Sequence, residues 1–269
     1  MSEGPQVRLR TEWLEKQLSG RTILNAQTVR PKLREASVLL PHRNVVSCFC
    51  KGKHIFIEFD GGLFLHNHLL MRGRWRREPG QLLIPPDDMW IGLYVGDATV
   101  YNLRGQVLEL IDRRQVDAAL KRLGPDAMAR PFPRDAVRRN LGGSDLPIAE
   151  FLLEQSLVSG VGNVAKSEIL FAAGIDPRQA ASSLSAEQTD RLFSATEAVL
   201  WESYRIGGRW THRVYRRRGQ ACEVCGNGIR LLRLAPSRRS IYFCPVCGVN
   251  GPSGRTVKSR SSEKRYVSK

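Results

Sequence analysis

Four cysteines in the C-terminal part of the chain have the spacing of a metal site. Cys222 and Cys225 form one Cys-x-x-Cys pair, and Cys244 and Cys247 form a second pair after eighteen intervening residues. Two such turns present four thiolates to one tetrahedral ion, as in a zinc ribbon. The alternative, a pair of disulfides, needs an oxidising compartment that nothing else in the sequence indicates. The spacing therefore predicts one structural Zn²⁺ with no open position for catalysis.

A carboxylate lies beside the first residues of the chain, which read MSEGPQV. An amphipathic helix is expected within the segment 8–20, with Pro5 near its first turn and Gly20 just past its end. Taken alone, Glu3 is best interpreted as an acid that complements the dipole of this helix.

The balance of charge indicates a polyanionic partner. The chain has 269 residues, a net charge of +16 and 42% hydrophobic residues, so we expect a folded protein that binds nucleic acid or an acidic membrane surface. Arginines alternate with aromatic residues in RIGGRWTHRVYRRRG and MRGRWRR, a combination that suits phosphate contacts and base stacking. A solvated basic face without a ligand is the alternative. No apolar run is long enough to span a membrane and no signal peptide is evident, so a cytoplasmic, nucleoid-associated protein is predicted.

The turn SGVGNVAKSE delivers an asparagine to the start of a helix. Gly160 and Gly162 lack the third glycine of a dinucleotide fingerprint, and a helix precedes them where a strand would be needed. Such a turn can instead point backbone N–H groups and the Asn163 side chain at an anion such as a DNA phosphate.

The elements that must position these residues change in character along the chain. Residues 22–112 alternate in the manner of strands, with hairpins expected at HIFIEF-DGG-LFLHNH and WIGLYV-GD-ATVYNL. Helices are expected within 113–128 and over 146–160, 163–174 and 186–204, the last opened by a capping box of Ser185 and Gln188. His66 and His68 share one face of a strand and are interpreted as packing residues, since no suitably placed carboxylate suggests a metal site.

These features predict an α+β multidomain protein. We expect an N-terminal β-sandwich domain with a terminal helix at 1–121, a helical domain at 122–215 and a zinc finger at 216–250. Residues 251–269 carry six basic residues and one acid, so a disordered basic tail is predicted there.

The motifs together resemble the Fpg/Nei family of base-excision DNA glycosylases. The resemblance runs in order from SEGPQV through GKHIFIEF, HLLMRG, LGPD, QSLVSGVGNVAKSEILFAAGIDP and VYRRRGQACEVCG to RRSIYFCPVCG, so it covers the chain except for its tail. It implies a β-sandwich, a helix-two-turns-helix domain and a C-terminal zinc finger, with DNA held between the two halves of a monomer.

The resemblance also implies roles for single residues. Asn163 and Arg239 match residues that grip phosphates, and Lys53 matches a hairpin lysine that reaches the damaged nucleotide. Met71 and Arg72 match the loop that fills the space left by a flipped base. In this family the processed N-terminal amine, normally of proline, attacks C1′ of the sugar, and the adjoining acid, here Glu3, moves protons.

Two positions depart from the family pattern. Ser2 stands in place of proline, although removal of Met1 would leave a primary amine that can still form an imine, and Gln6 stands where an acid is usual. Three features are similar to Nei-type members: the segment EGP, the missing DPRRFG loop and the short link before VYRRRG. This similarity implies oxidised pyrimidines as substrates in double-stranded DNA, with single-stranded DNA as a further form of the substrate. The alternatives are a catalytically silent reader of damaged DNA and a generic zinc-ribbon regulator.

Overall fold

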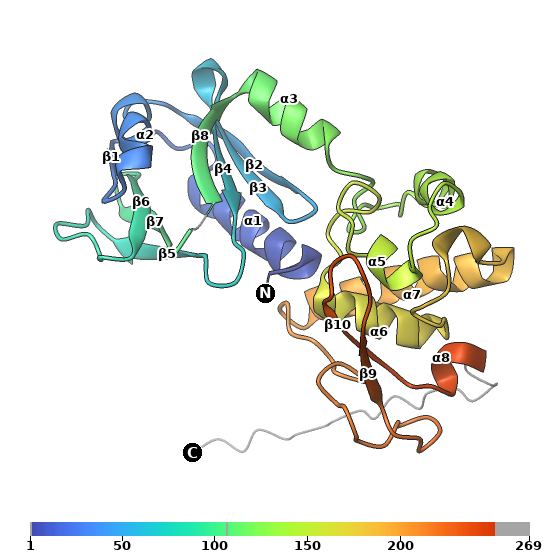
Figure 1. Ribbon diagram of the computed structural model, residues 1–269. Coiled ribbons are helices and arrows are strands. Elements are labelled where there is room, and N and C mark those ends of the chain that lie inside the picture. Colours follow the sequence, from blue (N-terminus) through green and yellow to red (C-terminus); the bar gives the residue numbers. More distant parts are fainter. Residues whose placement is uncertain (1, 106, 251–269) are drawn as a thin grey trace, which may run out of the picture.

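The structure is a computed structural model that describes residues 2–105 and 107–250 (Figure 1). Its N-terminal part contains two antiparallel sheets of four strands, in the orders β1-β6-β7-β5 and β2-β3-β4-β8. The elements of this part are α1 (Gly4–Leu18), β1 (Asn25–Gln27), α2 (Arg34–Leu39), β2 (Val45–Lys51), β3 (His54–Phe59), β4 (Leu63–His68), β5 (Arg74–Pro79), β6 (Met89–Tyr94), β7 (Ala98–Leu103), β8 (Val107–Asp112) and α3 (Arg113–Lys121).

Both predicted hairpins are present. β3 pairs with β4 from His54 opposite His68 to Phe59 opposite Leu63, and β6 pairs with β7. Gly61 has a φ of 74°, a left-handed conformation that glycine adopts at little cost, so the DGG segment can reverse the chain. The alternation of side chains along β3 and β4 then places one set of apolar residues in the core.

One apolar core joins α1 to both sheets. Leu14 and Leu18 of α1 pack with Ile57 of one sheet and with Leu93 and Val100 of the other, and all five side chains are fully buried. The predicted sandwich with a terminal helix is therefore confirmed. Because α1 is anchored on the core, its first residues are fixed where the sheets meet the helical part of the chain (Figure 1).

The helical part also follows its sequence signals at most points. Its helices are α4 (Arg134–Gly142), α5 (Ile148–Phe151), α6 (Asn163–Ala173) and α7 (Ala186–Arg205). The predicted capping box of α7 is present, since Gln188 N donates to Ser185 Oγ at 3.1 Å and Ser185 N donates to Gln188 Oε1 at 2.9 Å. α6 ends at Gly174, which has a φ of 63°.

The helix expected over residues 146–160 is wrong in length. α5 has only four residues, and the chain leaves the helical conformation after Leu152. The backbone of this segment pairs with the segment that follows α3: Ser159 N donates to Pro125 O at 2.9 Å, and Gly124 N donates to Gln155 O at 2.9 Å. These long-range hydrogen bonds outweigh the helical periodicity of the apolar residues.

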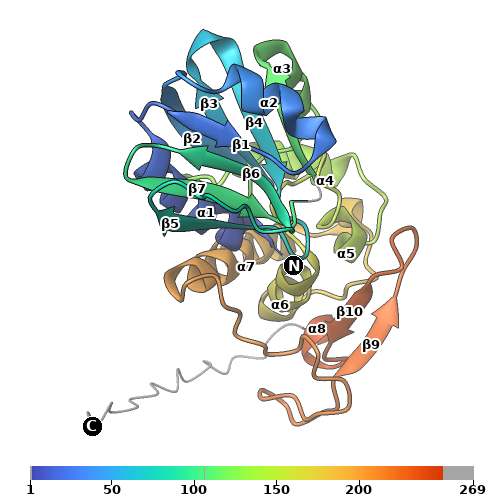
Figure 2. The ribbon, with the colours of Figure 1, turned by 90° about the vertical axis from the view of Figure 1, so that its left-hand side faces the viewer.

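The C-terminal finger consists of β9 (Arg230–Arg233), β10 (Ser240–Phe243) and α8 (Cys247–Asn250). Its hairpin lies alongside α6 (Figure 2), where Phe171 packs with Val214, Ile229 and three of the four cysteines. The predicted basic tail at 251–269 lies outside the described residues. Within residues 2–105 and 107–250, no helix combines the length and the apolar character needed to cross a membrane.

Candidate active site

Glu3 lies at the centre of the junction between the two parts of the molecule. Its side chain is fully buried, and its carboxylate accepts hydrogen bonds from Val164 N at 2.9 Å and Ala165 N at 3.0 Å. Both donors belong to the first turn of α6, where unpaired N–H groups and the helix dipole attract an anion. A Cβ atom on Gly162 would lie 2.3 Å from Glu3 Cδ, so only glycine fits at that position.

This contact corrects one interpretation of the SGVGN turn. The turn was expected to point backbone N–H groups at an external anion, but those of Val164 and Ala165 already bind the Glu3 carboxylate. Asn163 remains at the start of α6, where its Nδ2 lies 3.5 Å from the hydroxyl of Tyr215. Its Oδ1 is buried and has no hydrogen-bond partner among the described residues. The turn therefore binds an internal carboxylate and leaves the asparagine side chain as the remaining polar group.

Burial raises the pKa of Glu3 above its usual range, although the amide hydrogen bonds and the charge of Lys53 oppose the shift. A raised pKa makes a carboxyl group more ready to hold a proton and to exchange it with a bound reactant. Glu3 is therefore suited to act as a general acid or base beside Ser2.

The backbone nitrogen of Ser2 faces the loop that follows β4. It donates to the carbonyl oxygen of Leu70 at 3.1 Å. The next residue but one, Gly4, donates its N–H to Gly160 O at 2.8 Å, which ties the start of α1 to the helical part. The position of the Ser2 nitrogen is thus set by contacts with both halves of the molecule.

Lys53 reaches the same place from the turn between β2 and β3. The turn is pressed against the helical part: Gly52 has a φ of 59°, and a Cβ there would lie 2.7 Å from Ser159 Cβ. Gly52 N also donates to Asp126 Oδ2 at 3.1 Å. Burial lowers the pKa of Lys53 to about 8, so its amine changes protonation near physiological pH.

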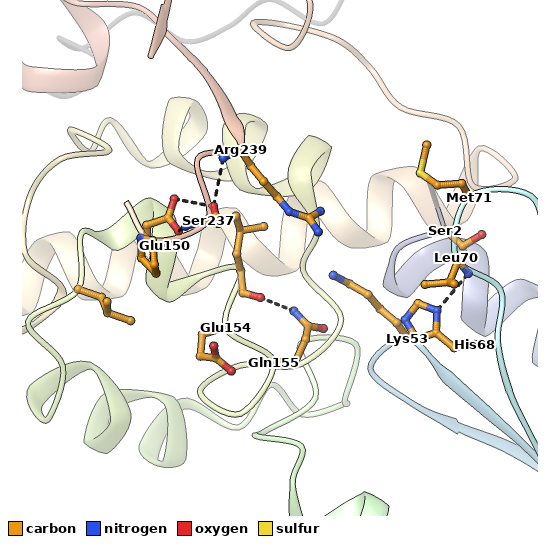
Figure 3. A pocket seen from close by; sticks show the side chains of 13 residues that line it. Ser2, Lys53, His68, Leu70, Met71, Glu150, Glu154, Gln155, Ser237 and Arg239 are labelled. Carbon is orange, nitrogen blue, oxygen red and sulfur yellow. Dashed lines mark hydrogen bonds between the residues drawn. The ribbon is translucent and has the colours of Figure 1, made fainter. Parts of the chain in front are cut away.

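Arg239 approaches from the hairpin of the finger, and its side chain points toward Lys53 (Figure 3). The turn that carries it is held by Glu150, a residue of α5 that is only 3% exposed. Glu150 accepts hydrogen bonds from Ser237 N at 3.1 Å and Ser237 Oγ at 2.9 Å, and Arg239 N donates to the same hydroxyl oxygen at 3.2 Å. The sequence did not lead us to predict Glu150 as a site residue. The signal that could have identified it is its place as the one acid within the apolar run LPIAEFLL, which indicates a buried carboxylate with a partner.

These side chains surround a cavity of about 530 Å³. Ser2, Lys53, Met71 and Arg239 lie on its walls, together with Glu150 and other residues of the helical part (Figure 3). The structure thus brings four of the predicted site residues to one cavity. The remaining lining residues are His68, Leu70, Leu146, Leu153, Glu154, Gln155, Pro236 and Ser237.

Of the other predicted site residues, Glu3, Asn163 and Arg72 lie outside the lining of this cavity. Glu3 is buried behind Ser2, and Asn163 lies at the start of α6. Met71 and Arg72 form an exposed turn after β4, with 64% of the Met71 surface accessible. An apolar side chain that is this exposed at the mouth of a cavity is available to contact a ligand.

The four cysteines of the finger are gathered as the spacing predicted. Their sulfur atoms all lie within 4.8 Å of one another, and Cys225 Sγ is 3.4 Å from Cys244 Sγ. Four converging thiols with no disulfide between them fit a single tetrahedral metal ion. The finger is attached through Glu168, a buried acid of α6 that accepts N–H groups from Arg213, Val214 and Tyr215 at 2.8 to 3.2 Å and that sequence reasoning also missed.

The histidines on β3 and β4 pack against one another, as expected. His66 stacks on Phe56 and on His54, and its Nε2 lies 2.8 Å from His54 Nδ1. A carboxylate does lie beside them, since Glu109 of the neighbouring strand β8 is 2.8 Å from His66 Nδ1, but it contacts the histidine directly and completes no metal site among the described residues. Within the described residues the cysteine cluster is the one group of three or more side chains placed to hold a metal.

Comparison with known proteins agrees with this architecture. The formamidopyrimidine-DNA glycosylase N-terminal domain matches residues 1–118, and the formamidopyrimidine-DNA glycosylase H2TH domain matches residues 123–214. Formamidopyrimidine-DNA glycosylase of Bordetella pertussis is 33% identical over 279 residues, and Endonuclease 8 of an Enterobacter species is 28% identical over 263 residues. In both comparisons 92% of this chain and 99% of the relative are covered.

Solved structures show the same relationship. The Fpg protein of Lactococcus lactis, in complex with DNA that contains an abasic site, has a TM-score of 0.81 and 25% identity. The match covers 91% of this chain and 99% of that protein. The chain is thus similar to these proteins along nearly its whole length, and it has a two-part fold, a buried acid near its N-terminus and a finger with four cysteines. The chain belongs to the Fpg/Nei family of DNA glycosylases.

Proposed function

We propose that this protein is a base-excision repair glycosylase with abasic-site lyase activity, which uses the N-terminal amine of Ser2 to remove oxidised bases from DNA. The observation that carries the proposal is that Ser2 lines the cavity while Glu3, the next residue, is fully buried and accepts hydrogen bonds from the start of α6. Membership of a family of DNA glycosylases supports the same reaction class.

The reaction begins once Met1 has been removed. The Ser2 amine attacks C1′ of the damaged nucleotide, the bond to the base breaks, and the base leaves with a proton. Loss of a proton from nitrogen and opening of the sugar ring then give an imine, with Glu3 placed to deliver a proton to the ring oxygen. Removal of a proton from C2′ allows elimination of the 3′ phosphate, and water releases the enzyme. An α-amino group, with a reference pKa of about 7.7, is partly neutral at physiological pH and can act as this nucleophile.

The charged residues of the cavity suit the backbone of a damaged DNA strand. Lys53 and Arg239 approach from opposite halves of the molecule, so a phosphate between them would be bound by both. Asn163 would supply a further phosphate contact from the start of α6, and Met71 with Arg72 would fill the space left by the flipped nucleotide. The net charge of +16 would attract DNA over a longer range.

We further propose oxidised pyrimidines as the substrates and one Zn²⁺ as the ion of the finger. The sequence features EGP and the short link before the finger support the substrate class. Cys222, Cys225, Cys244 and Cys247 would hold the zinc, whose role is to stabilise the hairpin that carries Arg239. Removing the ion with a chelator should therefore weaken the binding of abasic-site DNA, and returning Zn²⁺ should restore it.

Borohydride reduction of the imine tests the central proposal. The purified protein, shown by mass spectrometry to lack Met1, is incubated with abasic-site DNA and borohydride, and a covalent complex is expected whose adduct maps to Ser2. A matched control carries a retained N-terminal methionine and should trap far less. Binding of the DNA without any trapped complex would contradict the proposed lyase activity and would favour a silent reader of damaged DNA, the alternative that Ser2 in place of proline suggests.

A further inference from the structure

A histidine is connected to the Ser2 nitrogen through a single residue. Ser2 N donates to Leu70 O at 3.1 Å, and Leu70 N donates to His68 Nδ1 at 3.0 Å (Figure 3). Leu70 itself has a φ of 48°, in the left-handed region that a leucine adopts only at a cost. Such a conformation persists where the surroundings hold it, and the hydrogen bond to His68 is a contact that does so.

The His68 ring is kept in the state that this hydrogen bond requires. An imidazole nitrogen can accept a hydrogen bond only when it carries no proton. Burial, together with the charge of Lys53, lowers the pKa of His68 to about 4, so the ring is neutral throughout the physiological range. With Nδ1 as the acceptor, the proton of the neutral ring lies on Nε2.

The neighbouring side chains hold the ring in place from the sheet side. The His54 ring packs edge-on against His68, with 5.0 Å between ring centroids. His54 is in turn connected to His66 and through it to Glu109, by two contacts of 2.8 Å. The orientation of His68 is thus supported by a ring contact with His54, which two polar contacts connect to the exposed carboxylate of Glu109.

We propose that His68 is a positioning residue for the nucleophilic amine: by accepting the N–H of Leu70, it holds the Leu70 carbonyl against the Ser2 nitrogen. The inference rests on the proposed role of Ser2. A primary amine at Ser2 can donate one N–H to Leu70 O. This hydrogen bond restricts rotation of the amine and leaves the lone pair of the nitrogen to face the cavity. A displacement of about 1 Å of a reacting group can slow a reaction roughly 100-fold.

The two ring nitrogens can be separated by substitution. Asparagine places an amide oxygen near the position of Nδ1 and can still accept the Leu70 N–H, whereas glutamine places its amide near the position of Nε2. We expect His68→Asn to form the borohydride-trapped complex at a rate within about threefold of the unmodified protein. His68→Gln and His68→Ala should be roughly 10- to 100-fold slower. All three should bind DNA with a non-reactive tetrahydrofuran site with similar affinity.

The opposite order, with glutamine active and asparagine slow, would overturn the proposal and indicate direct contact between Nε2 and DNA. Equal rates for all three variants would also overturn it. If the unmodified protein forms no trapped complex, the proposed function fails. If all three variants form the trapped complex as fast as the unmodified protein, only the role of His68 is contradicted. A measurement on the unmodified chain avoids variants that do not fold: ¹⁵N resonances should show Nδ1 of His68 unprotonated between pH 5 and 8, and a protonated Nδ1 would overturn the proposal.

Discussion

Replacing Glu3 by glutamine should make the protein more stable while it abolishes its chemistry. The carboxylate is fully buried, and burial raises its pKa despite the two N–H groups that it accepts. A raised pKa in the folded protein means that the folded state binds the proton more readily than the unfolded chain does. Ionised Glu3 therefore costs folding free energy at neutral pH, and a neutral side chain of the same shape avoids that cost.

The magnitude follows from the contacts that glutamine keeps. Its amide oxygen can still accept an N–H from Val164 or Ala165, but the other N–H loses its acceptor, which costs about 1–3 kcal/mol and offsets part of the gain from removing the buried charge. We expect Glu3→Gln to raise the free energy of unfolding by about 0.5–2 kcal/mol at pH 7. Glu3→Ala leaves both buried N–H groups without an acceptor. At about 1–3 kcal/mol for each of the two donors, we expect it to lower the free energy of unfolding by about 2–6 kcal/mol, less the gain from removing the buried charge.

Urea unfolding followed by tryptophan fluorescence measures both effects. The advantage of Glu3→Gln should be full at pH values above the folded pKa and should disappear as the pH falls below about 4.3, the usual value for glutamate, because Glu3 is then protonated in both states. Borohydride trapping should be lost in the same variant. If Glu3→Gln is less stable than the unmodified protein at pH 7, the carboxylate is a net stabilising cap of α6 and the reasoning from burial is refuted.

Three further predictions follow from the same cavity. Gly162→Ala should slow trapping at least about tenfold, because its Cβ would displace the Glu3 carboxylate, while binding of tetrahydrofuran-site DNA persists; unchanged trapping would show that Glu3 has room to move. Since Lys53 loses its proton near pH 8, the salt dependence of DNA affinity should weaken above that pH and should stay constant in Lys53→Arg. Glu150→Ala should lower the affinity for DNA about as much as Arg239→Ala does, and the double variant should bind no more weakly than either single variant. Additive losses of affinity would mean that Glu150 does not act through Arg239.

Elements whose signals are local could be predicted from the sequence. The hairpin at Gly61, the capping box at Ser185 and the end of α6 at Gly174 each depend on residues within a few positions of one another. The cysteine cluster is equally local, because the two Cys-x-x-Cys turns leave few other uses for their thiols. In these cases the conformation that one residue type prefers is also the conformation that the fold requires.

Contacts between distant segments could not be predicted in the same way. Glu3 and Val164 are 161 positions apart, and nothing near either residue shows that one provides the anion for the other. The residues of the turn predicted an anion site correctly, but they could not identify the anion. Glu150 and Glu168 were missed for a related reason: each is an acid in an apolar helix whose partners are backbone N–H groups of the finger or of the segment before it.

The position of Gln6 shows how the two halves of the molecule share one site. An acid at position 6 could also accept the N–H of Glu3, as Gln6 Oε1 does at 2.9 Å. Only an amide, however, can at the same time donate to a carbonyl, and Gln6 Nε2 donates to Gly208 O, just beyond α7. A Cβ on Gly208 would lie 3.0 Å from Gln6 Cγ, and its φ of 78° also favours glycine. Gln6 thus gives the start of α1 a further attachment to the helical part, and the alignment of Ser2 and Glu3 depends on how α1 and α7 are joined.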